Sequence, residues 1–311
     1  MSWFFLSVIA LLCWSGSDLF SKIGCRDSSD KFSHFKMVTA VGAVMGLHAL
    51  YEIIFNDVEI SLNVMLTYLP VSLLYILSMA LGYVGLKYIE LSVSSPICNS
   101  SGALVVIATL VMALITGEGL AEYGTFHYIA LAMTCAGVIA LGIVEYREDD
   151  ELRIERQKIS NYKYAKSWKA FLFPIAYCVI DAAGTFADGI VLENLNEDSA
   201  NVAYELTFAL AGFVCLIITI VGLAKGKHTY SVKREGPKYI GALFETAGQL
   251  AYIYAIADED HFAMSAAIIA SYCAVSVLWS RIFLKEKLSV KHYITIGVTV
   301  VGIVIMGILD M

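Results

Sequence analysis

The stretch HYIALAMTCAGVIALGI at residues 127–143 returns without a gap as HYITIGVTVVGIVIMGI at residues 292–308. Seven of the 17 aligned positions are identical, which is too many for two unrelated apolar segments. Upstream of the two copies, LITGEGL at 114–120 aligns with IFLKEKL at 282–288. The chain therefore contains an internal repeat, and each copy ends in the same pair of apolar segments.

Apolar segments of about 20 residues, the length needed to cross a bilayer, recur ten times in the 311 residues. Hydrophobic residues make up 59% of the chain and charged residues only 16%, and the mean hydropathy is +0.72. This composition excludes a soluble enzyme, a nucleic-acid-binding protein and a disordered chain. We predict an all-α polytopic membrane protein with spans near 2–24, 35–55, 64–87, 91–116, 124–145, 168–192, 200–224, 237–257, 262–284 and 290–309.

The repeat unit holds five spans, and an odd number forces the second copy to enter the membrane in the opposite orientation. The charges agree, because the connection between the fourth and fifth spans holds no Lys or Arg, whereas its counterpart between the ninth and tenth holds four. We predict a first five-helix repeat at 1–145, a charged linker at 146–167 and a second, inverted repeat at 168–311.

All 21 Lys and Arg residues fall in or beside the odd-numbered connections. Both termini and the even-numbered connections hold no basic residue, and the even-numbered connections and the C-terminus carry acidic residues. Basic connections stay on the cytoplasmic side of a membrane. We therefore predict a plasma-membrane protein with both termini outside the cytoplasm and the 146–167 linker inside. The net charge of −7 indicates no particular partner, because in a membrane protein the placement of charges matters more than their sum.

Several strings resemble the EamA-type transporters of the drug/metabolite transporter superfamily. They are YVGLKYIELSVSSPICN at 83–99, GEGL at 117–120, RIFLKEKLS at 281–289 and GVTVVGIVIMG at 297–307. The resemblance implies a ten-helix transporter with its site near mid-membrane, lined by the first, third, fourth, sixth, eighth and ninth helices. The second copy departs from the pattern, with Met264 where the first has Pro96. Members of this family place both termini in the cytoplasm, the reverse of the charge-based prediction.

Carboxylates inside the spans are the strongest functional signal, because each charge at a helix centre costs about 2.5–3.5 kcal/mol on insertion scales. Asp181 and Glu245 lie near the middle of their spans, with no Lys or Arg at that depth. Such a carboxylate is either protonated or faces a cation. We predict that both bind substrate or carry a coupling proton. Asp188, seven residues beyond Asp181 on the same helix face, and Glu205 are further candidates.

Neutral polar and aromatic side chains on the same helices complete the candidate site. Gln249 and Tyr252 follow Glu245 on one helix face, and Asn99 lies in the fourth span. Aromatic faces attract ammonium groups, although many aromatics in membrane proteins serve as interface anchors instead. The remaining aromatic candidates are Trp14, Tyr83, Tyr177 and Tyr272.

Other polar residues have structural explanations. Asp18 can pair with Lys22 one turn later on its own helix, and His48 is expected to be a packing residue. The glycines of the repeated strings fit close helix packing. Because no metal-site, nucleotide-binding or nucleophile motif is present, we predict no cofactor, no metal and no enzymatic activity.

These features together predict a secondary transporter of a small cationic or zwitterionic metabolite, such as an amine or an amino acid. Transport would proceed by alternating access, and one carboxylate could carry a coupling proton. Two alternatives stay open: a carrier of neutral metabolites whose acids serve only protons, and a cation channel or magnesium permeation protein. The expected partners are a small molecule, membrane lipid and protons, with no nucleic acid, and the protein would be a monomer or homodimer.

Overall fold

The computed structural model describes residues 2–25, 27, 30–89, 91–116, 124–147, 168–226 and 229–309. Within these residues every regular element is a helix, as predicted. Helices are the expected solution because a bilayer offers no partner for an open backbone N–H or C=O group. The predicted linker lies outside the described residues from residue 148 onward.

Each predicted span forms a helix or a broken helix. They are α1 (Trp3–Cys25), α2 (Ser33–Phe55), α3 (Leu62–Gly85), α4 (Leu91–Asn99) with α5 (Ser101–Thr116), α6 (Thr125–Tyr146), α8 (Trp168–Leu192), α9 (Glu197–Ala224), α10 (Val232–Ile256), α11 (Phe262–Ala270) with α12 (Tyr272–Phe283), and α13 (Val290–Leu309). A short 3₁₀ turn, η1 (Glu259–His261), precedes α11.

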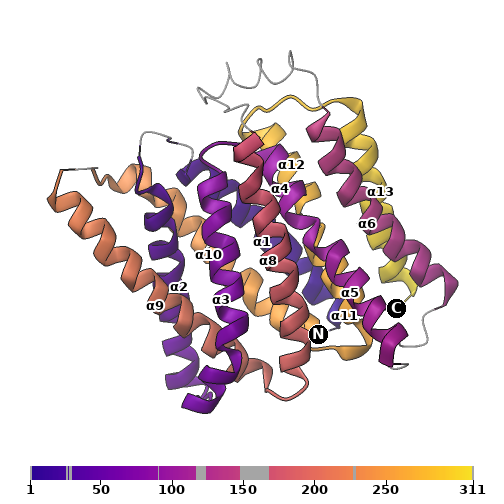
Figure 1. Cartoon of the computed structure of the whole chain (residues 1–311), viewed down its shortest axis with the longest axis horizontal. Helices are drawn as coiled ribbons and strands as arrows, with labels where there is room; N and C mark the ends of the chain where they lie inside the picture. The colour runs from indigo at the N-terminus through magenta and orange to yellow at the C-terminus, as the bar shows by residue number, and fades with distance from the viewer. Residues whose placement is uncertain are drawn as a thin grey trace.

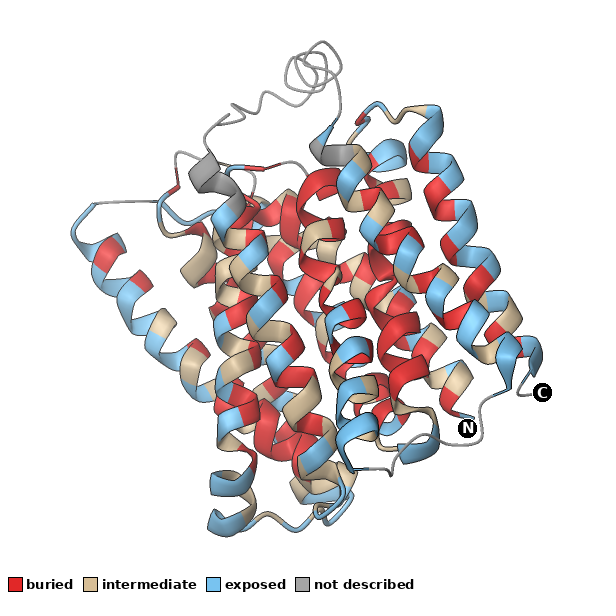
Figure 2. Cartoon of the chain, turned by 45° about the vertical axis from the view of Figure 1, so that its right-hand side comes forward, coloured by how far each residue is buried: buried red, intermediate tan, exposed pale blue. Residues whose placement is uncertain are grey.

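Nine of these segments, counting each broken helix as one, are long and apolar enough to cross a membrane. The exception within the described chain is α10, because Glu245, Gln249 and a charged first turn lower its hydropathy. It packs along α1 and against α2, and its Glu235, Lys238 and Gln249 side chains are buried there. Figure 1 shows how the described segments are arranged in the bundle. Figure 2 shows buried residues concentrated on the central helices and exposed residues on the flanks. The chain is a multi-pass membrane protein.

Polar caps extend two helices beyond their apolar segments. The Ser61 hydroxyl accepts a hydrogen bond from the Val64 N–H at 3.2 Å, so α3 begins before the predicted start at residue 64. The Asn196 side chain caps α9 in the same way and accepts from the N–H of Asp198 at 3.0 Å and of Ser199 at 3.3 Å. The caps lie outside the hydrophobic segments, which explains why hydropathy alone placed both starts too late.

The helices pair across the two predicted halves. α1 packs along α10 and α3 along α8, whereas α2 packs along α9 and α6 along α13. When the two sets of five helices are matched in order and exchanged, the α1–α10 pair becomes the α8–α3 pair, and the α2–α9 and α6–α13 pairs become themselves. A two-fold axis between the halves has this effect. The α2–α9 and α6–α13 pairs lie at opposite sides of the bundle, with the other helices between them (Figure 1).

The repeated stretch packs against its own copy. A Cβ atom on Gly137 would lie 2.2 Å from the Thr299 hydroxyl, and one on Gly302 would lie 2.4 Å from the Thr134 hydroxyl. In the ungapped alignment Thr134 corresponds to Thr299 and Gly137 to Gly302, so the two contacts are equivalent. The predicted close packing is confirmed at both glycines but is wrong at Gly297, around which there is open space.

The fourth and ninth spans break near their middles, where the sequence predicted continuous helices. α4 gives way to α5 at Ser100, and α11 to α12 at Ser271, whose N–H donates to the Ile268 carbonyl in a tightened turn. The two spans also meet there, because a Cβ on Gly102 would lie 2.4 Å from that of Ala270. Irregular backbone at membrane depth is tolerated only where protein buries it or where it lines a cavity.

Candidate functional site

A cavity lies beside the two helix breaks. Its lining comes from α1, α3, α4, α5, α8, α10, α11 and α12, with Tyr204 added from α9. The space open to the centre of a water molecule is about 90 Å³, which is room for several waters or for a small organic molecule in their place. These are the helices that the family resemblance implied, together with one residue from the seventh span.

Three carboxylates line the cavity: Asp18 from α1, Asp181 from α8 and Glu245 from α10. A serine on another helix holds each of them. The Ser101 hydroxyl donates to Asp181 Oδ2 at 2.8 Å, and the Ser17 hydroxyl donates to Glu245 Oε2 at 2.7 Å. Among the described residues that line the cavity there is no Lys or Arg, so only neutral donors offset the negative charge.

Asp18 is a cavity residue that the sequence analysis explained by a local ion pair. Its Oδ2 atom accepts a short hydrogen bond from Ser95 on α4 and another, at 2.8 Å, from Ser276 on α12. Lys22 donates instead to two backbone carbonyls just beyond α3, at 2.8 and 2.6 Å. The ends of helices leave carbonyls without partners, which explains where the lysine binds. A serine on a distant helix leaves no signal beside Asp18 in the sequence.

Aromatic rings form part of the cavity wall. The Trp14 ring centroid lies 5.1 Å from that of Tyr252 and 5.9 Å from that of Tyr272. Gly248 makes room for the indole, because a Cβ there would lie 2.4 Å from it. The indole N–H donates to the Glu245 backbone carbonyl at 3.4 Å, which ties the aromatic wall to the helix that carries a carboxylate.

Most of the predicted site residues line this cavity. They are Trp14, Tyr83, Asn99, Tyr177, Asp181, Glu245, Gln249, Tyr252 and Tyr272. Asn99 is tied back to its own helix, since its side-chain N–H donates to the Ser95 carbonyl at 2.8 Å. The sequence analysis left Tyr75, Ser17 and Ser95 out of the candidate site, because tyrosine and serine are common in membrane helices and nothing local singles these three out.

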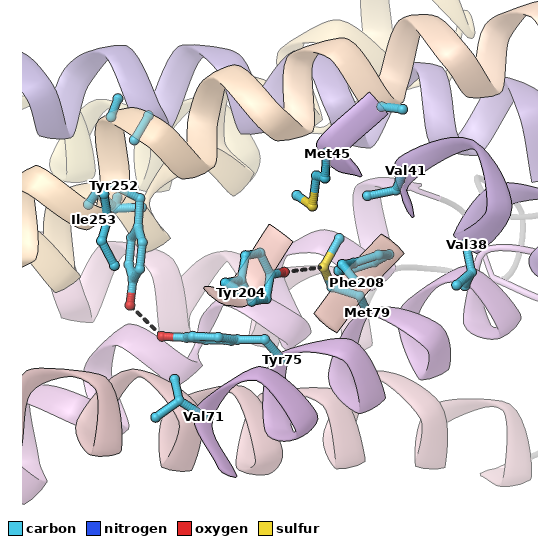
Figure 3. Close-up of a cluster of buried hydrophobic side chains, with 14 of the residues drawn as sticks. Val38, Val41, Met45, Val71, Tyr75, Met79, Tyr204, Phe208, Tyr252 and Ile253 are labelled. Atoms are coloured by element: carbon cyan, nitrogen blue, oxygen red, sulfur yellow. Dashed lines mark hydrogen bonds between the residues drawn. The ribbon is translucent and has the colours of Figure 1, made fainter. Parts of the chain in front are cut away.

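Asp188 lies behind the cavity wall and does not line it. Its carboxylate is fully buried and accepts hydrogen bonds from Tyr68 at 2.6 Å, Tyr252 at 3.2 Å and Tyr75 at 3.3 Å. The Tyr75 and Tyr252 hydroxyls, which do line the cavity, also share a short hydrogen bond (Figure 3). This tyrosine cluster joins α3, α8 and α10 around one acid.

Glu205 also lies away from the cavity, fully buried between α9 and α2. Both of its oxygens lie 2.9 Å from His48 Nδ1, and the other ring nitrogen of His48 lies 3.4 Å from Glu52. The histidine that the sequence presented as a lone packing residue is therefore the partner of a buried acid.

A buried ion network joins α1, α2 and α10 at the end of the bundle opposite the start of the chain. Glu235 accepts from Lys36 at 2.9 Å and from Lys238 at 2.6 Å, and Lys36 also binds Asp30 at 2.7 Å. Lys238 donates to the Gly24 carbonyl at 2.7 Å. Burial alone would raise the pKa of Asp30, but the hydrogen bond and charge of Lys36 hold it below its ordinary value.

Comparisons with known proteins agree with this architecture. Residues 168–308 match the model of the EamA-like transporter family. One solved crystal structure is similar over 99% of this chain and 96% of its own, with a TM-score of 0.63 and 14% identity, which shows a shared fold. No curated protein matches the chain. The resemblance predicted from the sequence is confirmed, and residues 168–308 belong to the EamA-like transporter family of the drug/metabolite transporter superfamily.

Proposed function

We propose that this protein is a secondary transporter that carries a small cationic or zwitterionic metabolite, an amine or an amino acid. The family match supports a membrane transporter of small molecules. One observation carries the class of cargo: the cavity presents Asp18, Asp181 and Glu245 but, among its described lining residues, no Lys or Arg.

A cation fits this cavity better than an anion or a neutral molecule. An anionic cargo would meet like charges in a region of low dielectric, where repulsion is strong. A neutral cargo would leave the carboxylates to be compensated by protons alone. An ammonium group would pair with a carboxylate and lie against Trp14 or Tyr252, whose ring faces attract cations.

We further propose that transport proceeds by alternating access between two inverted repeats, 1–145 and 168–311, in the plasma membrane. The start of α1 and the end of α13 lie at one end of the bundle (Figure 1). The charge bias supports placing this end outside the cytoplasm and the ion network of Glu235 on the cytoplasmic side. The network would then close the cytoplasmic entrance to the cavity.

The test is charge movement across a solid-supported membrane that carries the purified, reconstituted protein. Choline, betaine, polyamines and amino acids are applied in turn to the wild type and to the Asp181→Asn and Glu245→Gln variants. The Glu59→Gln variant is the matched control, because Glu59 is an exposed carboxylate in the α2–α3 connection. We expect saturable currents for one amine class that the control keeps and both cavity variants lose.

Two results would overturn the proposal. Full transport by both cavity variants would remove Asp181 and Glu245 from the site. Uptake that ignores the charge of the cargo but requires a pH gradient would replace the cation with a neutral metabolite and leave the acids as proton carriers.

A further inference from the structure

The three cavity carboxylates do not converge on one point. Each is anchored to a serine on a different partner helix, and the described residues include no group of three His, Cys, Asp or Glu side chains placed to hold a metal ion. Glu245 nevertheless lies within electrostatic range of both Asp18 and Asp181. The negative charge is therefore spread along one cavity, and a single compact cation cannot contact all of it.

Unpartnered polar groups in the same cavity indicate where a ligand is missing. The Ser21 hydroxyl, the Tyr83 hydroxyl and the Gln249 side-chain nitrogen line the cavity and have no hydrogen-bond partner, with 1%, 6% and 3% of each residue exposed. Buried polar groups are normally satisfied by protein, water or ligand. The protein itself supplies no hydrogen-bond partner to any of these three atoms.

These groups gather around Asp18 and Glu245. Ser21 follows Asp18 by three residues on α1, and Gln249 follows Glu245 by four on α10, so each pair shares a helix face. Tyr83 interacts electrostatically with Glu245 and, more weakly, with Asp18. An ammonium group donates up to three hydrogen bonds, and the Asp18 carboxylate with the Ser21 and Tyr83 hydroxyls supplies three acceptors.

We propose that the site takes an organic cation with two separated ammonium groups, a diamine, and that Asp18 recognises the second of them. The inference rests on the cation transport proposed above and narrows its substrate class. One ammonium group binds at Asp181. The other binds at Asp18 and Glu245, which lie close together because Ser17, the residue before Asp18, donates to Glu245. The Ser21 and Tyr83 hydroxyls complete this second position.

The experiment compares diamines with monoamines of matched length, for example 1,4-diaminobutane with butylamine, as half-saturating concentrations of the transport current. In the wild type we expect the diamine to bind about tenfold more tightly or better, because the second ammonium adds a charge-assisted contact. In Asp18→Asn we expect the diamine to lose its advantage and fall to the level of the monoamine, whose own half-saturating concentration rises by a smaller factor. Glu59→Gln should keep the wild-type ratio.

Equal half-saturating concentrations for the two amines in the wild type would overturn the diamine site and leave cation transport standing. Equal losses for both amines in Asp18→Asn would also overturn it, because Asp18 would then act on any cargo. Silence with both amines would instead remove the cation transport on which the inference rests. If Asp18→Asn fails to fold, the double variant Ser95→Ala/Ser276→Ala decides the question: it keeps the carboxylate but removes both donors that orient it, and an unchanged ratio would reject the role of Asp18.

Discussion

Glu205, like the cavity acids, is a carboxylate that is costly to bury in a membrane. Unlike them, it is compensated by a protein side chain of basic character, His48. Glu205 is fully buried and His48 half-buried between α2 and α9, away from the cavity, so we expect the pair to stabilise the fold. Removing one partner of such a pair leaves the other polar group without compensation, which typically costs about 3–5 kcal/mol, whereas replacing both can be nearly neutral.

We therefore expect His48→Leu to lower the thermal unfolding midpoint strongly and the double variant His48→Leu/Glu205→Leu to recover most of the loss. Thermal unfolding of the detergent-solubilised protein measures this. The double variant should transport the wild-type substrate at the wild-type rate. A folded double variant without transport would place Glu205 in the transport mechanism after all.

The sequence identified membrane carboxylates as candidates because their cost in lipid is independent of fold, and this is why Asp181 and Glu245 were found. It missed that Asp18 lines the same cavity and that Asp188 does not, since the groups that compensate these acids lie far away in the chain. Three tyrosines surround Asp188, and the donors to Asp18 come from α4 and α12. The neighbouring Lys22 made a local pair look sufficient for Asp18, although the lysine binds backbone carbonyls instead.

At the scale of the helices, hydropathy predicted which segments cross the membrane because lipid imposes that requirement on every residue of a span. It did not predict the breaks at Ser100 and Ser271, where the two spans approach each other closely. The proposed cavity lies beside these breaks, so the part of the fold that local sequence describes least is the part that would bind cargo.

The α6–α13 pair allows a matched test of helix packing. We expect Gly302→Ala to destabilise the protein by about 1–3 kcal/mol, because its Cβ would overlap the Thr134 hydroxyl and the Ala130 carbonyl. Gly297→Ala, on the same helix but in open space, should be neutral or slightly stabilising. Thermal unfolding midpoints of the two variants decide the matter, and equal shifts would contradict the packing described for α13.

At the scale of the whole molecule, the ion network of Glu235 holds α1, α2 and α10 together at one end of the bundle. We expect Glu235→Gln to weaken this closure, because the substitution removes the charge that Lys36 and Lys238 share. The thiol of Cys25, fully buried beside this network, is a native reporter. In a background whose other cysteines are alanine, maleimide should label Cys25 faster in Glu235→Gln than in Glu59→Gln.

An unchanged labelling rate in Glu235→Gln would mean that the network does not control access to this end of the bundle. The pH dependence provides a second check. Since the pKa of Asp30 is held below its ordinary value, its contribution to stability is present at neutral pH and is lost only as the pH falls through that lowered value. Closure should therefore persist in mildly acidic solution.

Three of the serines that hold the cavity acids bridge the two predicted repeats: Ser17 reaches Glu245, Ser101 reaches Asp181, and Ser276 reaches Asp18. Under the alternating access proposed above, these hydrogen bonds would hold the two repeats together. A cargo that binds the carboxylates would compete with the serine hydroxyls for the same oxygens. Binding of the cargo would then itself break the hydrogen bonds between the two repeats. A molecule that fills the cavity without reaching the carboxylates would leave these hydrogen bonds intact and act as an inhibitor.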